Sequence, residues 1–308
     1  MSARLRGIAK ETEEIVAAGG YTSPTGRSVR LAEWLAVAVE GTRLYGPGPV
    51  AAASPAGTGG GAAGPTRFEV TAEGSLAAAR RLSEDAAAPG RDADGAPHQA
   101  AGADPGVAVL NFSSARNPGG GYLNGAQAQE EAVCRGSALY TCLRRVPEFY
   151  AAHRADRSPF YTDRVIYSPA VPVFREEDGV LLERPFRAAF LTSAAPNAGV
   201  IAQRDPAAVA EVPAALASRA ERVLEVAAAH GHRRLVLGAW GCGVFRNDPA
   251  QVAGAFRDLL TGDGRFAGHF THVVFAVLDR RAESPTRGAF SKAFRPATEA
   301  AGAATGPR

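Results

Sequence analysis

The apolar residues of this chain change their spacing repeatedly, and each change predicts a new element. Short continuous apolar runs bounded by turn residues predict strands that are buried on both faces. These runs lie at 67–71, 106–112, 165–167, 187–192, 234–237 and 272–278. Longer runs with helical spacing predict helices at 75–82, 127–145, 206–230 and 249–260. Strands that alternate with helices predict one α/β domain with helices on both faces of a sheet.

The two ends of the chain and one internal stretch have a different composition. Residues 1–66 begin with helical spacing and end in GPGPVAAASPAGTGGGAAGPT, which offers almost nothing to bury. We therefore expect an N-terminal helical extension followed by a flexible linker. A similar stretch near 88–105 predicts a disordered insertion within the α/β domain, which spans 67–295. Residues 296–308 predict a flexible tail.

Charge and cysteine content narrow the class of protein. The 308 residues carry 34 basic and 31 acidic side chains, a net charge of +3, which disfavours a general DNA- or RNA-binding role. Three cysteines without paired spacing, Cys134, Cys142 and Cys242, argue against a disulfide framework and a zinc site. Neither a signal-like start nor an apolar run of about 18 residues occurs in the sequence. We therefore expect a cytoplasmic protein that binds no membrane.

Two glycine-rich loops follow predicted buried strands and precede predicted helices, which is where α/β sheets bind ligands. The first is NFSSARNPGGGYLNGAQAQEE at 111–131. Its glycine triplet, Gly119, Gly120 and Gly121, lets backbone amides approach an anion or a sugar. Taken alone, a glycine triplet in a chain with 35 glycines is more often a plain flexible turn.

The second loop, GAWGCGVFRNDP at 238–249, leaves the strand predicted at 234–237. Asp248 followed by Pro249 predicts a helix start, so the amides before it have the setting of a phosphate site without a lysine. Phe245 has two interpretations, a core anchor or a stacking platform for a nucleobase, and the core is the commoner one. No G-x-x-x-x-G-K-[ST] motif occurs, so a Walker-type nucleotide triphosphatase is not supported.

Two adjacent acids, Glu130 and Glu131, stand near the start of the predicted helix 127–145. Acids at a helix start usually lie in solvent and complement the helix dipole. The positions three, seven and eleven after Glu131 form an apolar stripe, Cys134, Ala138 and Cys142. Glu130 instead shares its side with Val133, Ser137, Thr141 and Arg144. We therefore expect Glu131 to point inward, which is costly for a carboxylate that is not used.

This pattern favours a single proton carrier over other kinds of catalytic site. Neighbouring helix residues diverge by about 100°, so Glu130 and Glu131 cannot flank one bond as the paired carboxylates of ordinary glycosidases do. No G-x-S-x-G motif occurs, and the six histidines lack the spacing of metal ligands. We expect no metal and no cofactor.

The glycine triplet, seven intervening residues and then Gln129-Glu130-Glu131 resemble the signature of poly(ADP-ribose) glycohydrolases, in particular the compact bacterial type built on a macrodomain. The motifs VLNFSSARNP, SPAVPVFR, TSAAPN and GAWGCGVFRN also resemble that family. The likeness covers most of the chain apart from the two insertions and the tail. It implies a three-layer α/β/α macrodomain-like fold with a mixed sheet. It also implies hydrolysis of the ribose–ribose O-glycosidic bonds of poly(ADP-ribose), with release of ADP-ribose.

The resemblance further implies roles for individual residues. Glu131 matches the family's catalytic glutamate, and Glu130 matches the neighbour that helps to hold the ribose. The glycine triplet matches the catalytic loop, 241–245 the diphosphate-binding loop, and Phe245 the aromatic residue that stacks on adenine. The implied substrate-binding residues are Gly119, Gly120, Gly121, Asn117, Gln129, Gly241, Cys242, Gly243, Val244 and Phe245. The implied partners are poly(ADP-ribose) and ADP-ribosylated proteins, with no sequence-specific nucleic acid among them.

The chemistry of a ribosyl acetal agrees with this assignment. One protonated glutamate gives its proton to the departing ribose oxygen while an oxocarbenium-like sugar forms. That role requires a raised pKa for Glu131. Burial, the like charge of Glu130 and the bound diphosphate would raise this pKa, whereas the helix N-terminus would lower it. Two alternatives stay open: a hydrolase of mono-ADP-ribosyl linkages, and a non-catalytic ADP-ribose reader, which has no need of a buried acid.

Overall fold

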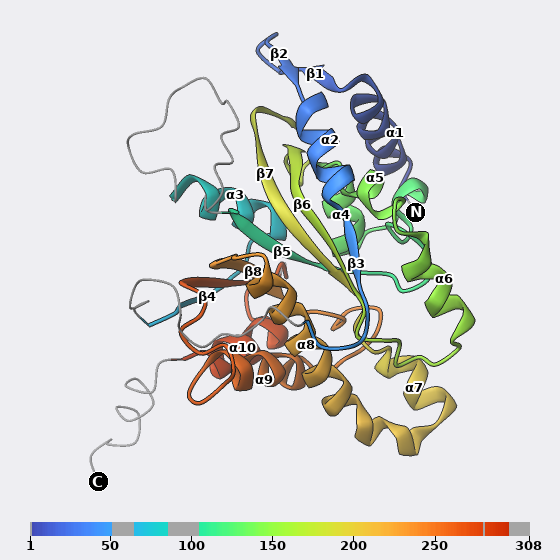
Figure 1. The fold of residues 1–308 in the computed structure, drawn as a ribbon, viewed down its shortest axis with the longest axis vertical. Helices are drawn as coiled ribbons and strands as arrows, with labels where there is room; N and C mark the ends of the chain where they lie inside the picture. Colours follow the sequence, from blue (N-terminus) through green and yellow to red (C-terminus); the bar gives the residue numbers. More distant parts are fainter. Residues whose placement is uncertain (1, 51–64, 86–104, 280, 296–308) are drawn as a thin grey trace.

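A seven-stranded sheet runs through the molecule between two layers of helices (Figure 1). The computed structural model describes residues 2–50, 65–85, 105–279 and 281–295. The sheet contains β3 (Arg43–Tyr45), β4 (Arg67–Thr71), β5 (Val107–Phe112), β6 (Val165–Arg175), β7 (Leu181–Ser193), β8 (Arg234–Gly238) and β9 (His272–Ala276). The described α-helices are α1 (Ala3–Ala18), α2 (Ala32–Gly41), α3 (Ser75–Asp85), α4 (Gln129–Gly136), α5 (Leu139–Leu143), α6 (Pro147–Ala155), α7 (Ala198–Arg204), α8 (Val212–Ala229), α9 (Pro249–Leu260) and α10 (Pro285–Ala293). Two 3₁₀ helices, η1 (Tyr122–Asn124) and η2 (Pro206–Glu211), and a small ribbon of β1 (Gly20–Thr22) with β2 (Ser28–Arg30) complete the described elements.

The order of the strands brings several carboxyl ends to one edge of the sheet. Across the sheet the order is β3-β6-β7-β5-β8-β9-β4. β5 pairs in parallel with β7 on one side and with β8 on the other, and β9 and β4 continue the parallel part. β6 and β3 are antiparallel strands at the opposite side. Because β5, β7 and β8 are parallel, the loops that follow them leave the same edge, which is where such sheets bind ligands.

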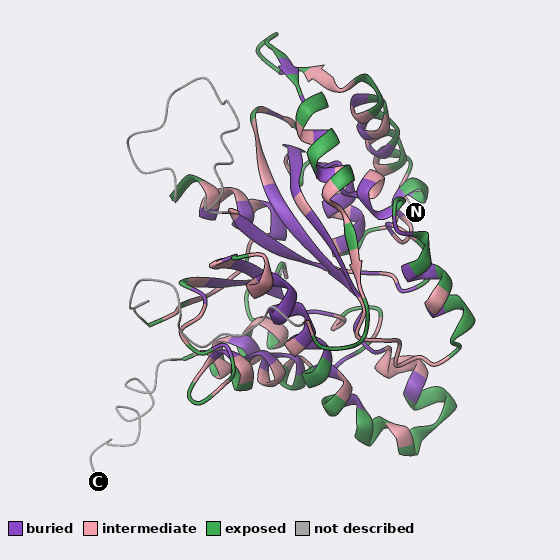
Figure 2. Ribbon diagram, viewed as in Figure 1, coloured by how far each residue is buried: buried purple, intermediate pink, exposed green. Residues whose placement is uncertain are grey.

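Alternate residues of β5 belong to two different cores. Val107 and Val109 pack on the side of α3, α4 and α5, whereas Ala108 and Leu110 pack on the side of α8 and α9. All four side chains are fully buried. Figure 2 shows buried residues along the central strands and exposed residues on the outer sides of the helices. The continuous apolar run at 106–112 therefore reflects a strand covered on both faces, and the three-layer α/β/α prediction is confirmed.

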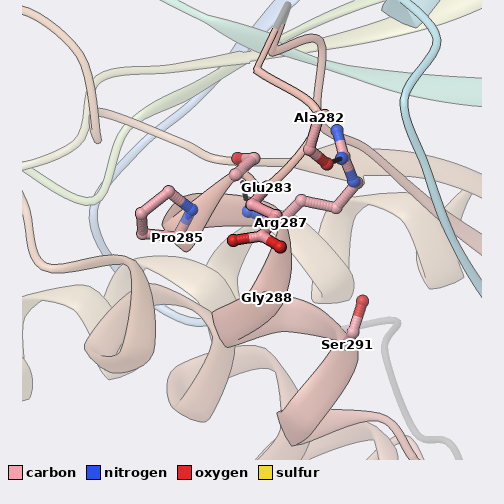
Figure 3. Close-up of a pocket in the computed structure, with 7 residues that line it drawn as sticks. Ala282, Glu283, Pro285, Arg287, Gly288 and Ser291 are labelled. Atoms are coloured by element: carbon pink, nitrogen blue, oxygen red, sulfur yellow. Dashed lines mark hydrogen bonds between the residues drawn. The ribbon is translucent and has the colours of Figure 1, made fainter.

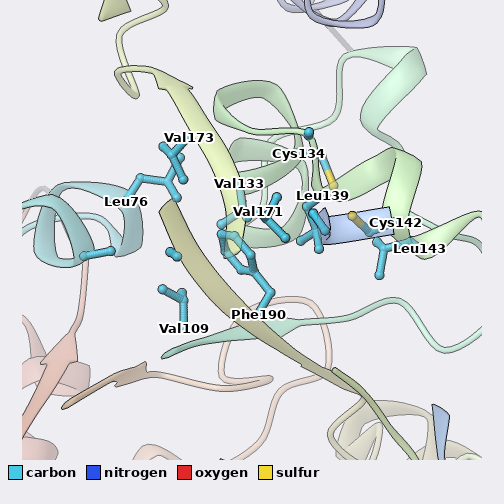
Figure 4. Close-up of a cluster of buried hydrophobic side chains, with 14 of the residues drawn as sticks. Leu76, Val109, Val133, Cys134, Leu139, Cys142, Leu143, Val171, Val173 and Phe190 are labelled. Atoms are coloured by element: carbon cyan, nitrogen blue, oxygen red, sulfur yellow. The ribbon is translucent and has the colours of Figure 1, made fainter. Parts of the chain in front are cut away.

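The core on the Val109 side contains the apolar stripe that was predicted to follow Glu131. Figure 4 shows Leu76 of α3, Val133 of α4 and Phe190 of β7 packed into one cluster with Cys134 and Cys142. Ala138 belongs to the same core. The periodicity of the sequence therefore identifies this stripe as buried, although Val133, on the side assigned to Glu130, is buried in the same core.

The N-terminal segment is helical and also contributes to the sheet. The backbone N–H of Leu5 donates to the Ser2 hydroxyl at 3.4 Å at the start of α1, and Gly19 ends the helix with φ at +69°. β3 then pairs with the edge strand β6. The predicted linker and the insertion near 88–105 lie mostly outside the described residues, and the tail at 296–308 lies wholly outside them. The domain boundary at residue 66 stays a prediction.

The single helix predicted at 127–145 is wrong, because the segment divides into α4 and α5. Gly136 has no room for a side chain, since Leu76 of α3 and the carbonyl of Arg175 occupy the place of a Cβ. Ser137 then becomes extended, with φ at −146°, and forms a bridge with Val173 of β6. Contact with the sheet therefore overrides local helical spacing. The helix predicted at 206–230 likewise consists of η2 followed by α8.

The strands predicted at 165–167 and 187–192 are parts of a much longer antiparallel pair, β6 and β7. The prolines of SPAVPVFR prevented the prediction of the full length of β6, because proline removes a ladder hydrogen bond and usually argues against a strand. The structure accommodates them with a shift of register between Ser168 and Val171, where Ala170 has φ at +47°. The sequence analysis also misses α6, α7 and α10.

His153 makes the folded state sensitive to acid. This side chain is fully buried on α6, and its Nε2 accepts the backbone N–H of Thr162 at 3.2 Å. Burial, with help from the charges of Arg219 and Arg164, lowers its pKa from 6.5 to about 4. Between these two values the unfolded chain takes up a proton that the folded chain refuses, so protons favour unfolding there.

We expect the free energy of unfolding to fall as the pH drops from 6.5 towards 4, the two pKa values of His153. Replacing His153 with Gln keeps an acceptor for Thr162 but removes the titrating group, so the same drop should cost the variant less stability. Urea unfolding of both proteins at about pH 7 and about pH 5 measures the difference. Equal losses in the two proteins would show that His153 does not set this dependence.

Candidate active site

The first glycine loop leaves β5 at the edge of the sheet and leads into α4. Gln129, the first residue of α4, fixes this path. Its Oε1 accepts the N–H of Phe112 at 2.9 Å, and its Nε2 donates to the Leu110 carbonyl at 2.9 Å and to the Ser75 hydroxyl at 3.0 Å. Both amide hydrogens of Gln129 therefore serve the scaffold, and its substrate-binding role stays a prediction.

Glu130 lies beneath the loop with only 2% of its surface exposed. Its Oε2 accepts the N–H of Ser114 at 2.7 Å, and its Oε1 lies 3.3 Å from both Asn111 Nδ2 and the Ser113 hydroxyl. Burial raises the pKa of Glu130 to about 8, against the hydrogen bonds from Ser114 and Asn111 and with a further contribution from the charge of Glu131. Glu130 is therefore mainly protonated at neutral pH.

The burial of Glu130 departs from the sequence pattern, which placed only Glu131 towards the interior. The residues on its side of the helix include Val133 and Ser137, both of which are buried as well. Asn111 was also missed as a site residue. The sequence does mark this residue, because Asn111 is a polar residue near the end of the apolar run VAVLNF.

Glu131 is the third residue of α4 and is 7% exposed, which confirms that it points inward. Its Oε1 accepts the N–H of Gly121 at 2.8 Å, and its Oε2 accepts the N–H of Ala128 at 3.0 Å. The second bond is one half of a capping box, and the other half is absent because Ala128 has no side-chain oxygen. Two backbone amides thus hold the carboxylate in one orientation, between the glycine loop and the start of the helix.

The glycine triplet is required by the closeness of the two carboxylates. A Cβ on Gly120 would lie 2.6 Å from Glu131 Oε1 and 3.1 Å from Glu130 Oε2. Gly119 and Gly120 have φ at +66° and +56°, in the left-handed region that favours glycine. Asn117 is exposed, and its carbonyl accepts the N–H of Gly120 at 3.0 Å. Both carboxylates therefore face Gly120 from the same side. This arrangement agrees with the prediction that Glu130 and Glu131 do not flank one bond from opposite sides.

The second glycine loop leaves β8 and is closed by Asn247. The N–H of Asn247 donates to the Gly241 carbonyl at 3.0 Å, and its Nδ2 donates to the Pro196 carbonyl at 2.9 Å. Gly241 has φ at +71°, and a Cβ there would lie 2.8 Å from the Cβ of Ala195. The loop is therefore anchored to the segment that follows β7.

Beyond that anchor, the middle of the second loop is open. No atom lies within 4 Å of the place of a Cβ on Gly243, Val244 is 81% exposed, and Cys242 is half-buried. Asp248 caps α9 as predicted, since its Oδ1 accepts the N–H of Ala250 at 2.6 Å and Pro249 is the first helical residue. Backbone at 242–244 is thus accessible immediately before a helix.

Three parallel strands bring the two loops together. The carbonyl of Ser193, at the end of β7, accepts the N–H of Ser113 from the first loop at 3.1 Å. The same carbonyl accepts the indole N–H of Trp240 from the second loop at 3.1 Å. At the base, a Cβ on Gly238 would lie 3.0 Å from Phe112 Cζ. The two motifs, more than a hundred residues apart in sequence, therefore form one edge of the sheet.

The structure places Phe245 partly in the core, and its role in stacking on a nucleobase stays a prediction. Its half-buried ring packs against the core on the α8 side and lies 6.0 Å, centroid to centroid, from the ring of Tyr161. Tyr161 has φ at +61° and lies two residues before Asp163, which pairs with the buried Arg219 at 3.1 Å. Tyr161 could not be identified from the sequence, because a tyrosine in a loop belongs to no periodic pattern.

A pocket of about 490 Å³ also lies at the first turn of α10, with residues from 282 to 291 around it (Figure 3). Its polar contacts are local. The N–H of Arg287 donates to the Ser284 hydroxyl at 3.0 Å, and the Arg287 guanidinium donates to the carbonyl of Ala282 at 2.8 Å. The start of α10 accounts for these contacts, so the candidate site remains at the glycine loops.

Within the described parts of the chain, no group of three or more His, Cys, Asp or Glu side chains has an arrangement that would hold a metal ion. In the same parts, no helix has the length and apolar character needed to cross a membrane.

Replacing Gly120 with Ala should lower the free energy of unfolding by about 1–3 kcal/mol, because the new methyl group crowds two buried carboxylates in a left-handed backbone. Gly254 of α9 is the matched control, since nothing lies within 4 Å of a Cβ there. Gly254→Ala should be stabilising by about 0.5–1 kcal/mol, as alanine favours a helix interior. Urea unfolding measures both, and a Gly120→Ala variant as stable as the native chain would contradict the crowding.

Comparison with known proteins agrees with this geometry. A family profile described as the microbial-type PARG catalytic domain, where PARG denotes poly(ADP-ribose) glycohydrolase, matches residues 9–176. No curated protein matches the chain. The solved poly(ADP-ribose) glycohydrolase of Thermomonospora curvata is 51% identical, with 95% of this chain and 100% of that chain covered and a TM-score of 0.84.

Two complexes with ligands are similar as well. The same T. curvata enzyme bound to the inhibitor ADP-HPD is 51% identical, over 95% of this chain and 100% of that one, with a TM-score of 0.82. The enzyme of Deinococcus radiodurans in complex with ADP-ribose is 45% identical, over 87% of this chain and 99% of that one, with a TM-score of 0.73. Together with the two glycine loops and the buried glutamate pair, these matches show that the chain belongs to the microbial-type poly(ADP-ribose) glycohydrolases.

Proposed function

We propose that this glycohydrolase cleaves the ribose–ribose bonds of poly(ADP-ribose) with Glu131 as its single proton carrier. The observation that supports this assignment most directly is the place of its carboxylate. Glu131 is almost fully buried, yet its Oε1 lies against the backbone of Gly120 at an open edge of the sheet. A carboxyl group held in this way can reach a sugar while water is mostly excluded from it.

In the proposed reaction the carboxyl group of Glu131 acts first as an acid and then as a base. Protonated Glu131 gives its proton to the ribose oxygen that leaves, the bond from that oxygen to the anomeric carbon breaks, and positive charge develops on the ribosyl ring. Water adds to the same carbon and gives a proton to the Glu131 carboxylate, which restores the acid. One water is consumed, and ADP-ribose and a polymer one unit shorter are formed. The bonds from Gly121 and Ala128 keep the carboxyl group in place through both halves.

Glu130 has a different role in this proposal, as a neutral ligand of the ribose. With a pKa of about 8 it is mainly protonated at neutral pH, so it can both donate to and accept from sugar hydroxyls. Its bonds to Ser114, Ser113 and Asn111 tie this position to the end of β5.

The second loop is suited to the ADP part of the substrate. The open backbone at 242–244 precedes the N-terminus of α9, a combination that binds phosphate through amides. Phe245 follows directly, with its ring partly accessible beside Tyr161, and a nucleobase that stacks there gains about 1–3 kcal/mol. Adenine on Phe245 and diphosphate on the loop would direct the ribose towards Glu131.

The remaining expectations about partners and location belong to this proposal. ADP-ribosylated proteins are the proposed macromolecular partners, as carriers of the polymer. The three cysteines are free, which suits a reducing compartment, and we propose a cytoplasmic location. Family membership favours the hydrolase over the non-catalytic reader, and activity on a mono-ADP-ribosylated protein would add the other linkage to its substrates.

Replacing Glu131 with Gln should lower the release of ADP-ribose from labelled poly(ADP-ribose) by about 10²- to 10⁴-fold, since the group that carries the proton is lost. Binding of ADP-ribose, measured by calorimetry, should be retained because the amide keeps the shape of the side chain. Glu148→Gln is the matched control at an exposed position of α6 and should cleave normally. If Glu131→Gln cleaves as fast as the native protein, the assignment of the acid is wrong.

Replacing Phe245 with Ala should weaken ADP-ribose binding by about 1–3 kcal/mol in calorimetry, through loss of stacking. Phe186 of β7 offers a control of the same chemistry, since it is also half-buried but packs against the other core. Phe186→Ala should lower stability and leave the affinity unchanged. Equal affinities for all three proteins would make Phe245 a core residue only.

A further inference from the structure

A buried arginine stands one helical turn after Glu131 on α4. Arg135 is 9% exposed, and its Nη1 donates to the carbonyl of Ala126 at 2.8 Å. Burial lowers its pKa, and the negative charge of Glu131 is the first influence that opposes this effect. Burial of a guanidinium costs free energy unless the group is paired and hydrogen-bonded. The mechanism described above gives Arg135 no task.

A chain of three hydrogen bonds leads from Arg135 to the carboxylate of Glu131. Arg135 Nη1 donates to the Ala126 carbonyl. The N–H of Ala126 donates to the Gly121 carbonyl at 3.2 Å. The N–H of Gly121 then donates to Glu131 Oε1 at 2.8 Å. Because Arg135 and Glu131 are on the same helix, the three bonds close a ring through the loop.

The N-terminal helix α1 holds the parts of this loop that Arg135 does not reach. The Tyr122 hydroxyl lies 3.1 Å from the Ala9 carbonyl and 3.0 Å from Glu13 Oε1. The N–H of Ser2 donates to the Gly125 carbonyl at 3.1 Å. The loop is therefore fixed by α1 at 122 and 125 and by Arg135 at the next residue. Release of the Ala126 carbonyl would free the segment that carries the Gly121 contact.

We propose that Arg135 is a positioning residue that sets the orientation of the Glu131 carboxylate through Ala126 and Gly121. This inference rests on the proposed role of Glu131 as the proton carrier. The guanidinium of Arg135 contacts the carbonyl of Ala126 in the first loop, so its loss should misplace the acid and leave the second loop intact. A displacement of about 1 Å at a reacting group costs on the order of 10²-fold in rate.

The experiment compares Arg135→Met, which keeps an unbranched apolar stem and removes the guanidinium, with Arg135→Lys, which keeps the charge and an N–H donor group. Arg145→Met is the matched control, because Arg145 is exposed. For each protein we would measure kcat and KM on poly(ADP-ribose), the Kd for ADP-ribose, and hydrogen exchange of the amides at 121–128. Glu131→Gln is measured in parallel.

For Arg135→Met we expect kcat to fall about 10- to 100-fold, with a native Kd for ADP-ribose and faster amide exchange at 121–128. Arg135→Lys should recover part of the rate, and Arg145→Met should match the native protein. A merely structural role would instead lower the fraction of folded protein and move kcat and binding capacity together. A native kcat in Arg135→Met would overturn the proposal.

If Arg135→Met does not fold, Arg135→Gln, a polar side chain without the guanidinium, takes its place. A lower kcat at native Kd then supports the proposal, and a native kcat overturns it. The parallel variant separates the two hypotheses. An active Glu131→Gln removes the proposed role of Glu131 as the proton carrier. An inactive Glu131→Gln beside a native-like Arg135→Met removes only the role of the arginine.

Discussion

The hydrogen bond from the Gly121 amide to Glu131 is the contact on which the site depends. A catalytic carboxyl group has to be shielded from water, because solvent screens charge and adds freedom of movement, but it also has to reach a sugar. Backbone amides meet both needs, since they bring donors without side-chain bulk. The absence of a Cβ on Gly120 then allows the loop to lie directly over both acids. The glycine triplet and the glutamates are therefore one structural unit.

A second glycine loop follows β8. Parallel pairing of the strands brings it beside the first glycine loop. β5 lies between β7 and β8, so the loops after all three strands leave one edge. The carbonyl of Ser193 receives a donor from each glycine loop and holds them in register. In the proposed function, loops that are far apart in sequence recognise the ribose end and the ADP end of one ligand. The two cores bury most residues of the central strands β5, β8 and β9 that carry this edge.

Prediction from sequence succeeded where one element determines the answer by itself. Asp248 and Pro249 mark the start of α9 because a cap needs only its own helix. The run at 106–112 predicts β5 because burial on both faces requires apolar residues throughout. Prediction from sequence failed where contact with a neighbouring element changes the local structure. The helix at 127–145 breaks at Ser137 because β6 pairs there, and the prolines of β6 concealed a long strand that its pairing with β7 stabilises.

The amino-acid sequence by itself determined the order of strands and helices around the site, the inward direction of Glu131 and the family to which the loops belong. These follow from periodicity within single segments and from a motif of contiguous residues. The tertiary structure decided the rest. It buried Glu130 beside Glu131 and raised its pKa, placed Tyr161 beside Phe245, and connected Arg135 to the acid through a loop. Burial and hydrogen bonding depend on the distance between segments in space, which a pattern along the chain does not contain.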